Sequence, residues 1–267
     1  MFGKSKAENT VWEKFPELKS IPKNKFPRHL LLIPDGNGRW ASLAHKNISE
    51  GHKAGADVIK KIYNDLWQLP IEFITIWGFS ANNWSRTREE ADGIMKVIDQ
   101  TLKVMLPSAI ERNARIIHIG RKDRIPKYLK VAFENAEKIT ENNKKSYLCL
   151  AVDFGGQDQE VRMMKRMVED RVKNITPEIL NSYRDGGGIV PPADLVVRTS
   201  GEKRTSDLGW LSINSELSFI QKLLPNISSK DIVDAIIDFS KRQRRFGGRP
   251  KGEPRQKAGR PLSVNSK

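Results

Sequence analysis

Residues 33–41, with the sequence IPDGNGRWA, place an acid, two glycines and an arginine within one short stretch. Gly36 and Gly38 allow backbone amides to approach an anion closely, and Arg39 can form paired charge-assisted hydrogen bonds to phosphate. Asp35 can hold a magnesium ion, which prefers oxygen ligands. Asp-Gly and Asn-Gly are also strong turn signals. The stretch therefore predicts either a diphosphate and magnesium site or an ordinary hairpin turn.

A second candidate anion site is the stretch GHKAG at residues 51–55. We expect Gly51 to precede a helix, so that His52 and Lys53 stand near its positive N-terminal end, where a diphosphate is stabilised. An ordinary solvated first turn of a helix explains the same residues.

The stretch GFSANNWSR, residues 78–86, follows the most apolar run of the chain. It collects polar side chains that could position an uncharged double bond beside a diphosphate, with two aromatic side chains as apolar walls. The polar residues are Ser80, Asn82, Asn83 and Arg86, and the aromatic residues are Phe79 and Trp84. A capped turn with a core tryptophan is the alternative interpretation.

Arginines recur later in the chain, in DLVVRTSGEKRTS at residues 194–206. Arg198 ends an apolar run, and Arg204 and Ser206 follow a glycine turn. Two arginines beside such a turn can bind a second diphosphate, although an ordinary surface loop can have the same composition.

Two further features lie toward the C-terminus. Glu216, in NSELSF, is a carboxylate among apolar and small residues, where burial is costly unless a partner or a metal compensates. In RQRRFGG, residues 242–248, glycines follow an arginine cluster that includes Arg245. A glycine-terminated helix with a solvated basic face explains that pattern equally well.

Short apolar runs alternate with amphipathic stretches of helical length along the chain, which predicts an α/β fold. We expect a single domain with a central, mostly parallel sheet flanked by helices on both faces, and ligands at the carboxyl ends of its strands. The predicted strands are 29–33, 73–79, 114–119, 147–153 and 194–198. The predicted helices are 52–67, 88–112, 125–141, 157–173 and 230–244. A loop is predicted at 185–192, which contains three glycines and two prolines.

The 267-residue chain carries a formal charge of +15, and most of this charge lies at its two ends. Residues 241–267 account for +9 and residues 1–28 for +4. A basic tail rich in glycine and proline is drawn to polyanions, of which an anionic membrane is one and nucleic acid another. Because the body has little excess charge, a nucleic-acid-binding protein is disfavoured. Cys149, the single cysteine, is expected in the core. The lack of an apolar run near eighteen residues and the charged N-terminal residues predict a cytoplasmic protein without a signal peptide.

Together and in this order, the motifs from His29 to Gly248 resemble the cis-prenyltransferase family, whose best-known members are similar to undecaprenyl diphosphate synthase. The resemblance implies condensation of isopentenyl diphosphate with an allylic diphosphate such as farnesyl diphosphate. It also implies Mg²⁺ as cofactor, a homodimer, and a catalytic domain over residues 29–248 between a basic N-terminal segment (1–28) and a basic tail (249–267). We expect an apolar cavity for the growing chain, lined by the helix near 88–112 and the strand at 73–79.

The resemblance assigns roles to the residues of the motifs. Asp35, Asn83 and Arg86 would be catalytic, and Asp35 and Glu216 would bind the metal, Glu216 in some relatives from across a dimer interface. Substrates would be bound by Gly36, Asn37, Gly38, Arg39, Trp40, His52, Phe79, Ser80, Asn83, Trp84, Arg86, Arg198, Arg204, Ser206, Arg245 and Gly247. Of these, Arg245 and Gly247 belong to the motif that reaches the neighbouring subunit's site.

The chain also departs from the family pattern. Ile48 stands where relatives usually carry an arginine for the starter diphosphate, so His45 or Lys46 would have to substitute for it. Asn82 replaces a common glutamate and Pro34 a common methionine, and the spacing before Glu216 is one residue short. Two alternatives therefore remain: a non-catalytic partner subunit of a prenyltransferase complex, and a short-chain or head-to-middle condensing enzyme.

Overall fold

A six-stranded parallel sheet forms the centre of the computed structural model, which describes residues 10–246 and 248. Its strands have the order β3-β4-β2-β1-β5-β6. Their bounds are β1 His29–Ile33, β2 Phe73–Ser80, β3 Ala114–Ile119, β4 Ser146–Phe154, β5 Leu195–Arg198 and β6 Glu216–Phe219. The predicted fold class is confirmed. The edge strand β6 was missed, because its four half-buried residues are too few to show a hydrophobic pattern.

The helices connect the strands in the order expected of an α/β domain. They are α1 Val11–Lys14, α2 Asn37–Leu43, α3 Ile48–Leu66, α4 Arg88–Glu111, α5 Lys127–Ile139, α6 Gly156–Glu169, α7 Pro177–Ser182 and α8 Ser229–Lys241. Short 3-10 helices are η1 Pro16–Ser20, η2 Lys23–Lys25, η3 Ala81–Ser85, η4 Gly209–Ser212 and η5 Leu224–Asn226. The predicted loop at 185–192 contains three consecutive glycines with positive φ, a conformation that few other residues adopt.

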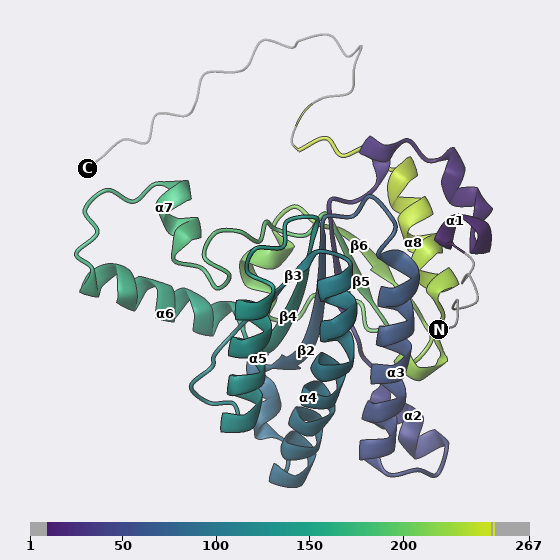
Figure 1. The fold of residues 1–267 in the computed structure, drawn as a ribbon, viewed down its shortest axis with the longest axis horizontal. Helices are drawn as coiled ribbons and strands as arrows, with labels where there is room; N and C mark the ends of the chain where they lie inside the picture. Colours follow the sequence, from purple (N-terminus) through teal and green to yellow (C-terminus); the bar gives the residue numbers. More distant parts are fainter. Residues whose placement is uncertain (1–9, 247, 249–267) are drawn as a thin grey trace, which may run out of the picture.

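The two faces of the sheet are covered unequally. In Figure 1, α3, α4, α5 and α8 lie across one face, whereas α6 and α7 extend away to the side. Leu30 and Leu32 of β1 belong to the core beneath the four helices. Leu31 and Ile33 belong to a smaller core on the other face, which contains side chains from residues 190–211. Both faces are covered as predicted, but much of the second cover is irregular chain and the 3-10 helix η4.

The first described residues belong to the same core. Val11 and Leu18 are buried, and the Lys14 ammonium contacts the Asp65 carboxylate of α3 at 2.5 Å. Cys149 is fully buried, as expected, and burial raises the pKa of its thiol to about 12. No helix in residues 10–246 is long and apolar enough to span a membrane. The basic tail, residues 249–267, lies outside the described residues.

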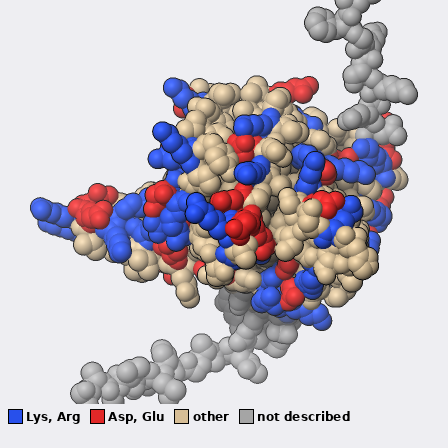
Figure 2. Space-filling view, turned by 90° about the horizontal axis from the view of Figure 1, so that it is seen from below, with Lys and Arg blue, Asp and Glu red and all other residues tan. Residues whose placement is uncertain are grey.

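On the face of the molecule that is seen from below in Figure 2, charged side chains of both signs are interspersed. Figure 2 shows Lys and Arg side chains beside Asp and Glu side chains over this surface, with no continuous basic area. This face of the described residues therefore lacks the single-sign field that nucleic-acid-binding proteins present.

Two buried histidines make the stability of the fold sensitive to acid. Burial lowers the pKa of His29 to about 4 and that of His118 to about 3, so both rings are neutral in the folded protein at pH 7. The unfolded chain takes up these protons below about pH 6.5. These two histidines therefore do not reduce the free energy of unfolding above pH 6.5. As the pH falls toward the folded pKa values they do reduce it, by roughly 2 kcal/mol per histidine at pH 5.

We expect urea unfolding to show a lower midpoint at pH 5 than at pH 7. His118→Gln should reduce that difference, because the substitution removes one of the two titrating rings. His45→Gln, which replaces an exposed ring, is the matched control and should retain it. An equal pH effect in wild type and His118→Gln would contradict the interpretation.

Candidate active site

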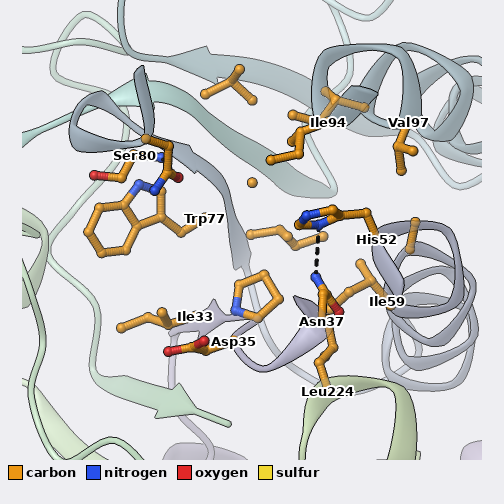
Figure 3. A pocket seen from close by; sticks show the side chains of 18 of the residues that line it. Ile33, Asp35, Asn37, His52, Ile59, Trp77, Ser80, Ile94, Val97 and Leu224 are labelled. Carbon is orange, nitrogen blue, oxygen red and sulfur yellow. Dashed lines mark hydrogen bonds between the residues drawn. The ribbon is translucent and has the colours of Figure 1, made fainter. Parts of the chain in front are cut away.

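A cavity of about 330 Å³ opens at the carboxyl edge of the sheet, between the sheet and helices α3 and α4. Figure 3 shows side chains of α3, α4, β1 and β2 converging on it. Its polar lining is Asp35, Asn37, His52, Ser80, Asn82, Asn83, Arg86, Thr101, Arg198 and Ser206. Its apolar lining includes Ile59, Ile76, Ile94, Val97, Ile98, Leu102, Met105, Leu150, Val152 and Leu224. The predicted walls, the 88–112 helix and the 73–79 strand, both line it.

Asp35 and Arg198 meet because β1 and β5 are neighbours in the sheet. Ile33 pairs with Arg198, so Asp35, two residues beyond β1, lies beside the end of β5. Arg198 Nη2 donates to Asp35 Oδ2 at 2.8 Å, and its Nη1 donates to the Arg204 carbonyl and to Ser206 Oγ, both at 2.8 Å. The guanidinium is only 6% exposed. The first and fourth sequence motifs therefore form one cluster.

Arg39 and Arg204 lie at the rim of this cluster. Arg39 Nη2 donates to Ser200 Oγ at 2.6 Å and is 3.8 Å from Asp35 Oδ1. Both arginines contact Glu202, at 3.4 Å in the case of Arg39. Glu202 was missed as a site residue because an acid in a basic loop gives no distinctive signal. It partly neutralises the rim, and a diphosphate would have to compete with it for the two guanidinium groups.

The IPDGNGRWA stretch forms a helix N-terminus instead of a hairpin. Gly36 takes the N-cap position of α2 with φ = 105°, a left-handed conformation, and no side chain caps the helix. A Cβ at this position would lie 2.9 Å from the Leu223 side chain. The amides of the first turn are thus available to an anion. Trp40 does not line the cavity; its indole N–H donates to Asn226 Oδ1 at 2.9 Å and ties α2 to η5.

The glycines of GHKAG serve close helix packing. A Cβ on Gly51 would lie 2.3 Å from the Asn37 carbonyl oxygen, and one on Gly55 would lie 2.2 Å from Asn37 Oδ1. Both residues must therefore lack side chains for α2 to pack on α3. Asn37 Oδ1 is buried without a hydrogen-bond partner among the described residues, and the residue lines the cavity. A bound donor would satisfy it.

The expectation that His52 stands at a helix N-terminus is wrong. Helix α3 begins at Ile48, and Asn47 and Glu50 cap it reciprocally, so the amides of Asn47 and Glu50 are already bonded. His52 lies in the second turn, where its Nδ1 is 3.4 Å from the side-chain nitrogen Nδ2 of Asn37. Burial, followed by the charge of Arg86, lowers the pKa of His52, whereas Glu90 opposes that shift. A neutral imidazole therefore faces the cavity.

The 80–86 segment places its polar groups in the cavity and its aromatic ring behind. Asn83 Oδ1 accepts from the Ser80 amide at 2.9 Å, which closes the 3-10 turn η3, and Arg86 Nη1 donates to Glu90 Oε1 at 2.6 Å. Phe79 and Trp84 were expected to wall the cavity, but neither lines it. Their rings pack against each other at 5.0 Å. The alternative interpretation, a capped turn with a core tryptophan, describes this geometry.

Glu216 and Arg245 lie away from the cavity of their own chain. Glu216 begins β6 and pairs with Leu195 at the amino end of β5, whereas Arg198 is at the carboxyl end. Its carboxylate accepts from Arg242 at 3.0 Å. Arg245 is exposed beyond α8, and Gly247 lies outside the described residues. Glu216 and Asp35 of one chain therefore do not share a metal ion in this structure.

Residues from α4, β4 and η5 complete the cavity, although no motif marked them individually. Ile94 to Met105 on α4 follow one apolar face over roughly 17 Å of helix. Leu224 reaches the cavity because its amide donates to the Asp35 carbonyl at 3.1 Å. Helical periodicity could have identified the α4 residues, but nothing in the local sequence indicated Leu224.

This arrangement defines an α/β enzyme with an anion-binding carboxyl edge and an adjoining apolar cavity. The prenyltransferase family model described as undecaprenyl diphosphate synthase matches residues 33–247. The isoprenyl transferase of Aquifex pyrophilus is 36% identical over 224 residues, covering 84% of this chain and 96% of that protein. That of Bacillus anthracis is 34% identical over 238 residues, covering 86% and 92%. The chain therefore belongs to the cis-prenyltransferase family and is a prenyl-transferring enzyme.

A solved structure agrees with that assignment. Lavandulyl diphosphate synthase from Lavandula x intermedia, in complex with dimethylallyl diphosphate, superposes with a TM-score of 0.79 at 29% identity. The match covers 84% of this chain and 99% of the other. The likeness thus extends over nearly all of that relative.

Gly55→Ala tests whether close packing of α2 on α3 supports the site. The added methyl would overlap Asn37 Oδ1, so we expect a loss of roughly 1–3 kcal/mol in unfolding free energy, together with weaker binding of inorganic diphosphate. Gly93→Ala on α4 is the matched control, since nothing lies within 4 Å of its added Cβ. It should stabilise the protein, by up to about 1 kcal/mol. Similar unfolding curves for the two variants would contradict the packing argument.

Proposed function

We propose that the protein is a magnesium-dependent Z-isoprenyl diphosphate synthase. It would condense isopentenyl diphosphate with an allylic diphosphate, release diphosphate and form a Z-polyprenyl diphosphate. One observation carries the proposal: Asp35, the uncapped start of α2 and the buried Arg198 lie together at the mouth of an apolar cavity. Charged ends and apolar tails of two prenyl substrates fit that juxtaposition.

The two diphosphates would occupy neighbouring positions. The allylic diphosphate would bind at the first turn of α2, between the amides that follow Gly36 and the Arg39 guanidinium, with its tail in the cavity. The isopentenyl diphosphate would bind Arg198, Arg204 and Ser206, which one loop holds together. Asn83 and Arg86 line the same cavity and would hold the reacting ends in line.

Bond formation requires the allylic carbon–oxygen bond to weaken, so negative charge builds on the departing diphosphate. Arg39 and the α2 amides would meet that charge with donors already in place. The neutral His52 beside Asn37 would donate or accept a hydrogen bond without repelling a cation. The new bond to isopentenyl diphosphate would form as the old bond breaks, and the proton lost from the isopentenyl unit would pass to an oxygen of the departing diphosphate.

The residues present fit a magnesium ion that is shared with a substrate. No group of three or more acids, histidines or cysteines in residues 10–246 could hold a metal without help. Asp35 supplies one carboxylate that is 31% exposed, and phosphate oxygens and water would supply the other ligands. When bound, Mg²⁺ would neutralise charge on the leaving diphosphate. Asp35 Oδ2 is bonded to Arg198, whereas Oδ1 has, among the described residues, only Arg39 Nη2 at 3.8 Å, so Oδ1 is the oxygen that would take the ion.

We propose that Glu216 and Arg245 act on the site of a neighbouring subunit in a homodimer. The support is their position: both lie away from the cavity of their own chain. Glu216 would first have to exchange its ion pair with Arg242 for another contact. Contact of the basic tail with an anionic membrane, where a long product would leave, also remains a proposal.

The apolar cavity would bind the growing chain. Each added unit brings five apolar carbons, worth roughly 4 kcal/mol of transfer out of water at about 0.8 kcal/mol per carbon. The similarity to lavandulyl diphosphate synthase favours a second candidate of the same chemistry, a short-chain or head-to-middle condensing enzyme. A non-catalytic partner subunit is disfavoured, because Asp35 and Arg39 are both present.

The proposal is tested by incubating the protein with labelled isopentenyl diphosphate, Mg²⁺ and either dimethylallyl, geranyl or farnesyl diphosphate, followed by product sizing. We expect Z-configured products that EDTA abolishes. Asp35→Ala should lower turnover at least about 100-fold, measured on protein that circular dichroism shows to be folded, because the substitution also removes one partner of the buried Arg198. Asp57→Ala, which removes an exposed carboxylate on α3, is the control and should remain active. A folded, fully active Asp35→Ala enzyme would mean that the metal site lies elsewhere.

Lys46 is the candidate substitute for the arginine that relatives carry at Ile48. It lies at the exposed connection between α2 and α3, where its ammonium contacts Glu50 at 3.0 Å. If it also attracts the starter diphosphate, Lys46→Ala should raise the KM for the allylic substrate severalfold and leave kcat unchanged. His45→Ala provides the comparison for the other candidate. An unchanged KM in Lys46→Ala would exclude this role.

A further inference from the structure

A fully buried carboxylate, Asp153, lies behind the segment that carries Asn83 and Arg86. It stands near the carboxyl end of β4, whose neighbour in the sheet is β2, and Val152 pairs with Phe79. This register brings Asp153 against the turn that follows β2, although the two are far apart in sequence. Asp153 is 0% exposed and does not line the cavity. It therefore acts on the cavity, if at all, through another residue.

Asp153 is fixed by several contacts. Arg124 donates to both carboxylate oxygens, at 2.8 Å from Nε and 2.5 Å from Nη2. The Asp153 carbonyl accepts from the Arg121 amide at 3.1 Å, and its backbone has the left-handed φ of 52°. A buried charge is costly unless it is paired and bonded, and here it is both. The Arg124 side chain is 36% exposed and Asp153 is fully buried, so the ion pair extends from the surface to the inner side of the 80–86 segment.

The third donor to Asp153 comes from the segment itself. Trp84 Nε1 donates to Asp153 Oδ1 at 2.9 Å. The indole also packs edge-on against Phe79, so both its ring plane and its N–H direction are set. Trp84 is adjacent to Asn83, whose side chain closes the turn, and two residues before Arg86. Fixing the indole thus fixes the backbone that aims both polar residues at the cavity.

The other attachments of this segment are local or loose. Most hydrogen bonds that this segment makes within the described part of the chain join residues within 80–90, such as Asn83 to Ser80 and Arg86 to Glu90. Asn82 and Arg86 are exposed. A turn held chiefly by its own residues can move as a unit. The bond from Trp84 to Asp153 instead ties it to a second strand of the sheet.

We propose that Asp153 is a positioning residue for the proposed prenyl transfer: by holding Trp84 from behind, and being held by Arg124, it fixes the 80–86 segment over the cavity. The inference rests on the proposed function for the roles of Asn83 and Arg86. The anchoring itself is independent of the substrate, so it can be measured without turnover.

Hydrogen–deuterium exchange of the 80–86 amides is the first readout. Trp84→Phe keeps an aromatic ring against Phe79 but removes the N–H, so we expect these amides to exchange at least about tenfold faster. Asp153→Ala should have a similar effect. Combining the two substitutions should add little, because each of them removes the same hydrogen bond between Trp84 and Asp153. Asp153→Asn retains an acceptor for Trp84 and should keep exchange near the wild-type rate, even though the pairing with Arg124 is weakened.

Steady-state kinetics is the second readout. We expect Trp84→Phe to lower kcat roughly 10- to 100-fold with little change in the allylic KM, since a small misplacement of reacting groups costs rate more than binding. The matched control is Asp65→Ala, which removes another buried carboxylate, bonded to Lys14 and Ser229 and outside the cavity lining. It should lower stability while leaving both the 80–86 exchange and kcat unchanged.

Each outcome decides the proposal. Wild-type exchange and kcat in Trp84→Phe would overturn it, as would an Asp65→Ala control that accelerates exchange and slows turnover equally. If Asp153→Ala does not fold, Trp84→Phe and Asp153→Asn carry the test. Absence of prenyl transfer by the wild-type protein would refute the proposed function instead, and the exchange measurements would still show whether Asp153 holds the segment.

Discussion

The parallel register of β1 beside β5 is the constraint on which the rest of the site depends. It sets the end of β5 beside the residues that follow β1, and so brings the Arg198 guanidinium to 2.8 Å from the Asp35 carboxylate. An arginine that is 6% exposed would be very costly without a partner. Asp35, the Arg204 carbonyl and Ser206 supply its bonds. The same contacts that make this arginine tolerable also organise the loop after β5.

This pairing has a consequence for binding. If a metal ion binds Asp35 and an anion binds Arg198, as proposed above, the two ligands carry opposite charges beside each other, and each would favour the binding of the other. The uncapped first turn of α2 and the apolar cavity lie directly beside the pair. Charge is therefore concentrated at the edge of the sheet, and the interior remains available to hydrocarbon.

Several residues that resemble substrate contacts in the sequence support the site from behind. Trp40 is tied to Asn226 and Trp84 to Asp153, each through its indole N–H. A large ring with one donor is well suited to this role, because it fills space and fixes a direction together. Gly51 and Gly55 likewise allow α2 to approach α3. The positions of the residues that line the cavity are thus fixed by packing and hydrogen bonds of residues outside it.

The sequence by itself determined the architecture and most of the polar groups at the site. Apolar runs identified five strands closely, and Asp35, Asn83, Arg86 and Arg198 indeed line one cavity, because ligands collect where parallel strands end. Only the tertiary structure decided what depends on contacts between distant segments. These are the edge strand β6 and the position of Glu216 away from Asp35. The start of α3 at Ile48 is different, because the Asn47–Glu50 capping box that sets it is local in the sequence. Local patterns record the period of an element, whereas register and packing arise between elements and leave no local trace.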